Sequence, residues 1–207
     1  KHAFAQFKTV ARQLEFPLLK VKALFQMGNL AFYSGKYEIA VKYYRKIAEF
    51  FPDTNRKISE FALYRTGYCL SRIGREKEAY ETFNRLLELF PDSAYCAQVD
   101  FSLGCQDYNN GDFYSAYSRF KTVVDAFPKS EFAPDAAFWL AKSIYETGNA
   151  EKTVAVLEKL LASERKSNYQ AEAELMCARV LADLGQTARA ISILERSAAD
   201  TARPFVR

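Results

Sequence analysis

Histidine is nearly absent from this chain of 207 residues, which has one, His2, close to its start. Because the single histidine lies at the terminus, the serine–histidine and cysteine–histidine arrangements of nucleophilic enzymes are excluded. The four cysteines form no CxxC or CxxH pair, so we expect no zinc site and no other metal. The sequence has neither a GxxxxGK phosphate loop nor a GxGxxG turn, and we therefore expect no cofactor. These absences predict a protein that is not an enzyme.

Linker-forming and membrane-spanning segments are also missing. The chain has 8 glycines and 6 prolines, and they form no flexible or low-complexity tract. No apolar run approaches the ~18 residues of a membrane span, so we expect no membrane insertion within this segment. The formal net charge is only +4, and the lysines form no stripe interleaved with aromatic residues, which argues against a nucleic-acid partner.

The charge is unevenly distributed. Residues 1–60 contain eleven Lys or Arg against five Asp or Glu, which leaves a balance of −2 for the rest of the chain. A basic end of this kind could meet an acidic partner or a membrane surface, or its lysines could be scattered surface charge.

The cysteines, Cys69, Cys96, Cys105 and Cys177, each fall within a predicted helix. A free thiol buried in a helix behaves as a small apolar side chain, and we expect that role for all four. An even number of cysteines leaves disulfides as the alternative in an oxidising compartment.

The few glycines that are present occupy two positions of one repeating pattern. One set recurs at intervals of 39, 37, 37 and 37 residues and comprises Gly35, Gly74, Gly111, Gly148 and Gly185. The other set lies seven residues earlier in three of the units and comprises Gly28, Gly67 and Gly104. A period of this length is typical of a stacked array of helical repeats, each of which buries its apolar face against its neighbours.

Each position of the unit has a physical reason. A glycine such as Gly67 inside the first helix removes bulk where two helices cross, and the next one, Gly74, can take the left-handed conformation that ends the helix. A Phe-Pro pair, as at Pro91, ends the second helix. Ser93 and Ser130 then suit the N-caps of the following first helices, which we expect the extra residues after the proline to lengthen.

The pattern of small residue, glycine, alanine, aromatic and proline resembles the tetratricopeptide repeat over nearly the whole chain. The departures are the longer period, Asp107 and Thr153 at usually apolar or small positions, and Arg165 in place of proline. The FPxS segments, FPDSAYCAQ and FPKSEFAPDAA, are similar to repeats of bacterial envelope proteins, notably the outer-membrane assembly lipoprotein and Tol–Pal accessory families. The resemblance therefore favours a periplasmic or envelope-associated location, with the cytoplasm as the alternative.

The resemblance implies an all-α fold, a right-handed solenoid of antiparallel helix pairs. We expect one array over residues 1–207, as a segment of a longer protein. Its parts are the second helix of a preceding repeat at 1–17 and five repeats at 21–54, 60–93, 97–130, 134–167 and 171–204.

In such arrays the first helices line a concave face, and the resemblance assigns partner-binding positions to it. These positions are Phe25, Asn29, Phe32, Tyr64, Tyr68, Phe101, Tyr108, Phe138, Lys142, Tyr145 and Arg179. The aromatic residues could hold apolar side chains of a peptide while Lys142 and Arg179 meet acidic groups. The same aromatic residues could instead pack against adjacent helices. Phe25 stands where chaperone-tail-binding members have a clamp lysine, which argues against that particular activity.

We therefore predict a non-catalytic scaffold that binds a partner protein or peptide through the concave face. Two alternatives remain open. One is a segment for self-assembly, and the other is a regulatory or substrate-positioning arm of an enzyme whose catalytic domain lies outside this segment.

Overall fold

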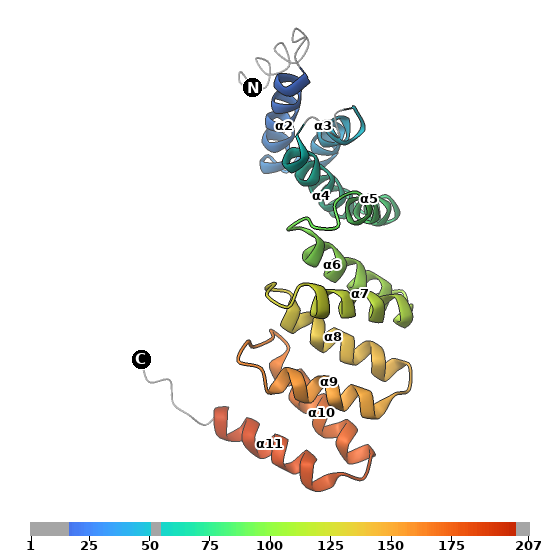
Figure 1. The fold of residues 1–207 in the computed structure, drawn as a ribbon, viewed down its shortest axis with the longest axis vertical. Helices are drawn as coiled ribbons and strands as arrows, with labels where there is room; N and C mark the ends of the chain where they lie inside the picture. The colour runs from blue at the N-terminus through green and yellow to red at the C-terminus, as the bar shows by residue number, and fades with distance from the viewer. Residues whose placement is uncertain (1–16, 51–54, 202–207) are drawn as a thin grey trace, which may run out of the picture. The chain divides into compact units, whose positions relative to one another are not determined.

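The computed structural model describes residues 17–50 and 55–201, which form ten α-helices and no strand (Figure 1). The helices are α2 Pro17–Tyr33, α3 Tyr37–Phe50, α4 Arg56–Arg72, α5 Glu76–Leu89, α6 Cys96–Asn109, α7 Phe113–Ala126, α8 Ala133–Glu146, α9 Ala150–Leu161, α10 Gln170–Asp183 and α11 Thr187–Thr201. The helix predicted for residues 1–17 lies outside the described residues up to residue 16, and Pro17 instead begins α2.

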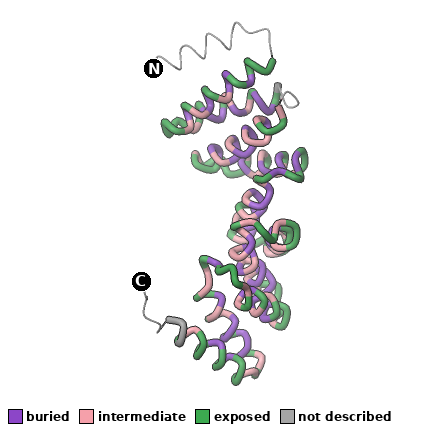
Figure 2. Tube along the Cα trace, turned by 60° about the vertical axis from the view of Figure 1, so that its left-hand side comes forward, coloured by how far each residue is buried: buried purple, intermediate pink, exposed green. Residues whose placement is uncertain are grey.

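Consecutive helices pack as antiparallel hairpins, in which the even-numbered helix is the first and the odd-numbered helix the second (Figure 1). The contacts divide the chain into two compact units, Lys1–Val99 and Asp100–Arg207. Buried residues follow one side of each helix, and exposed residues follow the other (Figure 2). Amphipathic helices pack in this way, with the apolar side against neighbouring helices and the polar side in solvent.

The glycine that ends each first helix has the predicted left-handed backbone. All five glycines of this set have φ between 69° and 82°. At the end of α4, the N–H of Gly74 donates to the carbonyl of Ser71 at 3.0 Å, and the N–H of Arg75 donates to that of Leu70 at 2.9 Å. The carbonyls at the helix end are thus satisfied within the turn, as expected for a glycine C-cap.

The glycine within the first helix lies against the aromatic side chain of the second helix. A Cβ atom built on Gly67 would be 2.4 Å from Cε1 of Phe83, and one on Gly28 would be 2.5 Å from Cε1 of Tyr44. These distances are shorter than van der Waals contact, so a side chain larger than hydrogen cannot be placed there without moving the ring. The predicted close crossing is confirmed.

The segment after the second helix differs from the prediction. The extra residues do not lengthen the next first helix, since α6 and α8 have 14 residues each against 17 for α4. They form tight turns instead: the N–H of Ser93 donates to the carbonyl of Phe90 at 2.9 Å, and its own carbonyl accepts from the N–H of Cys96 at 3.1 Å. The hydroxyl of Ser93 accepts from the N–H of Tyr95 at 3.3 Å, so this serine caps the turn and not the helix. We call this segment, which runs from Phe90 to Cys96 here and has equivalents in the other repeats, the entry turn.

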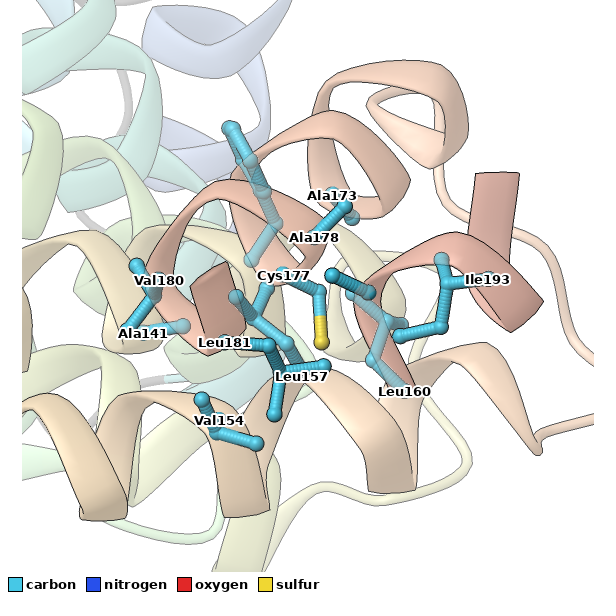
Figure 3. Packing of buried hydrophobic residues seen from close by; sticks show 12 residues of the cluster. Ala141, Val154, Leu157, Leu160, Ala173, Cys177, Ala178, Val180, Leu181 and Ile193 are labelled. Carbon is cyan, nitrogen blue, oxygen red and sulfur yellow. The ribbon is translucent and has the colours of Figure 1, made fainter. Parts of the chain in front are cut away.

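The cysteines are free thiols, which agrees with the structural role predicted for them. Cys177 lies in an apolar cluster of the second unit, where its sulfur points towards Leu157 and Leu160 (Figure 3). Burial raises the pKa of this thiol to about 11 and that of Cys69 to about 12. Thiols with such pKa values are poor nucleophiles at neutral pH.

The departures from the usual repeat have structural roles. The carboxylate of Asp107 accepts a hydrogen bond from Nε of Arg119 at 2.8 Å, and Asp100 accepts from Nη1 of the same arginine at 3.3 Å. Thr153 is buried and donates its hydroxyl hydrogen to the carbonyl of Asn149 at 2.8 Å. Arg165, in place of proline, reaches back to the preceding entry turn.

Candidate functional site

In the second unit, the first helices bring four of the predicted residues together. Nζ of Lys142 on α8 lies 4.9 Å from the ring centroid of Tyr108 on α6 and 4.2 Å from that of Trp139. Cζ of Arg179 on α10 lies 5.8 Å from the ring centroid of Tyr145 on α8. Aromatic faces attract cations, so the two charges are held against rings. We call Tyr108, Lys142, Tyr145 and Arg179 the first-helix site.

The hydrogen bonding of this site leaves its cations without carboxylate partners. Among the residues that the structure describes, no ion pair is formed by Lys142 or Arg179. The hydroxyl of Tyr108 donates to Oε1 of Glu146 at 3.1 Å. Burial, followed by the charge of Glu146, raises the pKa of Tyr108 to about 12. The tyrosine therefore stays protonated and acts as a donor at neutral pH.

In the first unit, the corresponding residues surround an arginine that the sequence did not single out. Cζ of Arg65 lies 4.2 Å from the ring centroid of Phe32 and 4.9 Å from that of Phe61. The rings of Phe32 and Tyr68 are 5.7 Å apart. Nε of Arg65 is buried without a hydrogen-bond partner in the described part of the chain. Asn29 is already engaged, because its Oδ1 accepts a hydrogen bond from the hydroxyl of Tyr44 at 2.7 Å.

One set of predicted aromatic residues occupies the same position in successive first helices and packs between repeats. The set comprises Phe25, Tyr64, Phe101 and Phe138. Tyr64 stacks on Tyr95 with the ring centroids 4.6 Å apart, and Phe138 stacks on Tyr169 at 4.9 Å. Phe101 contacts Phe132 with the ring centroids 5.6 Å apart and the ring planes tilted by 35°. Phe25, for which no entry-turn partner is described, packs on Phe61 at 5.2 Å.

Burial follows from this stacking. Tyr64 is 9% exposed and Phe138 is 5% exposed, whereas Phe101 and Phe25 are half-buried. The surface that remains open to a partner is formed by residues four and seven positions farther along the first helices, such as Lys142 and Tyr145 after Phe138. Tyr64 and Phe138 are thus placed in the packing between repeats, which is the alternative that the sequence left open.

A sequence signal for this packing exists. The aromatic partners of Tyr64, Phe101 and Phe138 are each the third residue of a Ser-x-aromatic triplet. The three triplets, Ser93–Tyr95, Ser130–Phe132 and Ser167–Tyr169, recur every 37 residues. The serine hydroxyl accepts a hydrogen bond from the N–H of the aromatic residue in each case. The triplet fixes the turn and directs the ring back onto the preceding first helix. Trp139 shows no comparable sequence signal, although its ring contacts Tyr108 and Tyr169.

Within the described ranges, no three histidine, cysteine or carboxylate side chains are close enough to hold a metal ion. No helix in that part of the chain has the length and apolar character needed to cross a bilayer.

Comparison with known proteins supports the repeat assignment. Family models of the tetratricopeptide repeat match residues 21–54 and 61–93, and a tetratricopeptide repeat-like domain model matches residues 118–205. None of the curated proteins matches the sequence.

Solved structures with the same fold include two structures of MamA and one of repeats from a putative kinesin light chain. One MamA structure gives a TM-score of 0.66 at 16% identity, over 90% of this chain and 98% of that chain. MamA from residue 41 to its end, from Desulfovibrio magneticus RS-1, gives 0.63 at 16% identity, over 86% and 92%. Tetratricopeptide-like repeats of a putative kinesin light chain from Podosopora anserina give 0.61 at 16% identity, over 94% and 100%.

The family matches and the structural neighbours together support the tetratricopeptide repeat family for this chain. The fold is all-helical and of the tetratricopeptide solenoid type, which is generally a scaffold for protein–protein interaction.

Proposed function

We propose that the chain is a non-catalytic scaffold that binds an acidic segment of a partner protein on the exposed face of its first helices. The observation that carries the proposal is the first-helix site, where Lys142 and Arg179 lie against aromatic rings with no carboxylate partner among the described residues. A cation fixed on a ring is preorganised, so a partner carboxylate would meet it at a low entropic cost. In the first unit, Arg65 likewise places a cation against aromatic rings, those of Phe32 and Phe61.

The aromatic rings supply the apolar part of the contact. Tyr108 and Tyr145 are half-buried, and each keeps part of its ring open beside a cation. Burying an aromatic side chain at an interface contributes roughly 1.5–3 kcal/mol through its apolar area. The FPxS entry turns favour the bacterial envelope as the location of this scaffold, because they resemble the turns of envelope repeat proteins.

Site-specific photocrosslinking tests the proposal. A photoreactive phenylalanine analogue placed at Tyr145 should capture a partner in extracts, which mass spectrometry of the crosslinked peptides then identifies. The same analogue at the exposed Tyr114, on second helix α7, is the control position. Capture from Tyr114 with none from Tyr145 would contradict the proposed face.

With the partner in hand, Lys142→Ala combined with Arg179→Ala should weaken binding at least about tenfold, because two cations lose their carboxylate contacts. Isothermal titration measures the loss. Lys142→Arg retains the charge and should bind within a few-fold of the parent.

A further inference from the structure

A groove on the opposite side of α8 is not part of the first-helix site. It lies between second helices α7 and α9, with α8 as its floor, and has a cavity volume of about 510 Å³. Its apolar walls include Val124, Ala137, Leu140, Ile144 and Val156. Leu140 precedes Lys142 by two residues, which is a rotation of about 200° around the helix axis. We call this depression the α7–α9 groove.

The first unit contains the equivalent groove, between α3 and α5 over α4, and it is smaller and polar. Its volume is about 280 Å³, and its lining includes Leu63, Thr66, Glu81 and Thr82. Leu63 and Ala137 each lie eleven residues before the glycine that ends their helix, so they occupy the same position. The α7–α9 groove is more open because an alanine stands in place of this leucine.

The polar positions of the first-unit groove have become apolar in the second. Leu140 stands at the position of Thr66, Val156 at that of Thr82, and Ala155 at that of Glu81. An apolar groove of this volume falls in the range of ligand sites, ~300–1,000 Å³.

The charged residues on the rim also differ between the two grooves. In the first unit, Arg45 forms an ion pair with Glu78 at 2.6 Å. The position of Glu78 is held in the second unit by Lys152, and that of Arg45 by Lys121. A cation–carboxylate pair is thus replaced by two cations.

These cations are only partly neutralised. Lys121 pairs with Asp125, but Lys152 donates to the neutral hydroxyl of Tyr117 at 3.0 Å. Within the described residues, Lys159 forms no ion pair.

At the end of the groove, a further cation is fixed in place. Nη1 of Arg165 donates to the carbonyl of Pro128 at 2.8 Å, and Nη2 donates to that of Ser130 at 2.7 Å. Both acceptors are neutral, so the guanidinium keeps its full charge while its position is held. Arg165 is the residue that replaces proline in this repeat, which gives the substitution a role at the groove.

We propose that the α7–α9 groove is a second docking site, which binds a protein segment with aliphatic side chains between acidic residues. The aliphatic side chains would fill the space above Ala137 and Ala155. The carboxylates would meet Lys152, Lys159 and Arg165 on the rim. This site is independent of the first-helix site, since the two use opposite sides of α8.

The test uses the full chain and a synthetic dodecapeptide with two central leucines flanked by glutamates. Amide chemical shifts in ¹H–¹⁵N spectra should change along α7, α8 and α9, with a Kd below about 1 mM. Ala137→Leu should weaken this binding at least about tenfold, because it places in the groove the side chain that fills the first-unit groove. Lys152→Glu should also weaken it, by recreating the Arg45–Glu78 type of pair with Lys121.

Matched controls test whether binding depends on the groove and on its charge. Lys77→Ala, on the exposed surface of α5 and outside both proposed sites, should leave the Kd unchanged, and a peptide with lysines in place of the glutamates should not bind. Circular dichroism checks that Ala137→Leu folds. If it does not fold, the double variant Lys152→Glu with Lys159→Glu, which changes only exposed rim residues, tests peptide binding to the groove in its place.

Several results would overturn the proposal. They are the absence of binding at about 1 mM, equal binding to Ala137→Leu and the parent, and shifts confined to the first-helix site. Binding of decanoate in the groove without binding of the peptide would assign the groove to a fatty acyl chain instead. Sedimentation showing that the groove variants change only self-association would assign it to a second copy of this chain.

Discussion

At the scale of single residues, the crossing glycines control how closely two helices approach. Gly67→Ala should lower the free energy of unfolding by about 2 kcal/mol, because the added methyl group would overlap the buried ring of Phe83. Urea denaturation measures the change. Combining Gly67→Ala with Phe83→Leu should cost less than the sum of the two single changes, since the smaller side chain makes room. An unchanged free energy of unfolding for Gly67→Ala would contradict the prediction, because it would mean that the ring of Phe83 moves aside at no cost.

A second residue-scale prediction concerns the pH dependence of stability. Burial raises the pKa of Asp100 above its ordinary value of 3.8, although Arg119 acts in the opposite direction. The folded chain therefore holds this proton more tightly than the unfolded chain. Its contribution to stability is fully present below pH 3.8 and is lost as the pH rises through the folded pKa. The unfolding free energy of the parent minus that of Asp100→Asn should fall as the pH rises from about 3 to about 6.

Asp112 provides a matched control for this prediction. The N–H of Ser115 donates to its carboxylate at 3.0 Å and lowers its pKa. The corresponding difference for Asp112→Asn should therefore rise with pH over the same interval, since this contribution is lost as the pH falls through the folded pKa. Equal slopes for the two variants would refute the assignment for Asp100. Urea titrations at a series of pH values supply both curves.

At the scale of helices and turns, the entry turn connects successive hairpins through its aromatic residue. Tyr169 stacks on Phe138 and also contacts Trp139 at a centroid distance of 5.6 Å. Tyr169→Ala should lower the free energy of unfolding by about 2–3 kcal/mol, because the buried ring of Phe138 loses its cover. Thermal melts followed by circular dichroism measure the effect.

Tyr169→Phe is the control for that change. It keeps the ring and should unfold within about 0.5 kcal/mol of the parent. If Tyr169→Ala were as stable as Tyr169→Phe, the stacking would contribute nothing to the joint between hairpins.

At the scale of the whole molecule, the helix contacts within each unit are mainly between neighbours along the chain, so a local change should have a local effect. Gly67→Ala should speed amide hydrogen exchange in α4 and α5 by about tenfold or more, while exchange in α9 and α10 stays within about twofold of the parent. Mass spectrometry of peptic fragments resolves these segments. Equal acceleration in both regions would mean that the described repeats unfold as one cooperative body.

The sequence by itself determined the repeating hairpin. The left-handed glycine turn and the close crossing at Gly67 depend on backbone conformation and on residues within one unit, so a single repeat contains the information. The period then extends this local structure along the chain. The same reasoning placed the cysteines in helices as thiols.

Only the tertiary structure decided which surfaces are open. Phe138 and Tyr145 occupy the same helix, and what distinguishes them is Tyr169, a ring delivered by the next repeat. The α7–α9 groove likewise results from Ala137 and Ala155 on different helices, and neither residue defines a cavity alone. Exposure and volume depend on side chains that are distant in sequence and adjacent in space, and for that reason the periodicity predicted the helices but not which of the expected positions remain open.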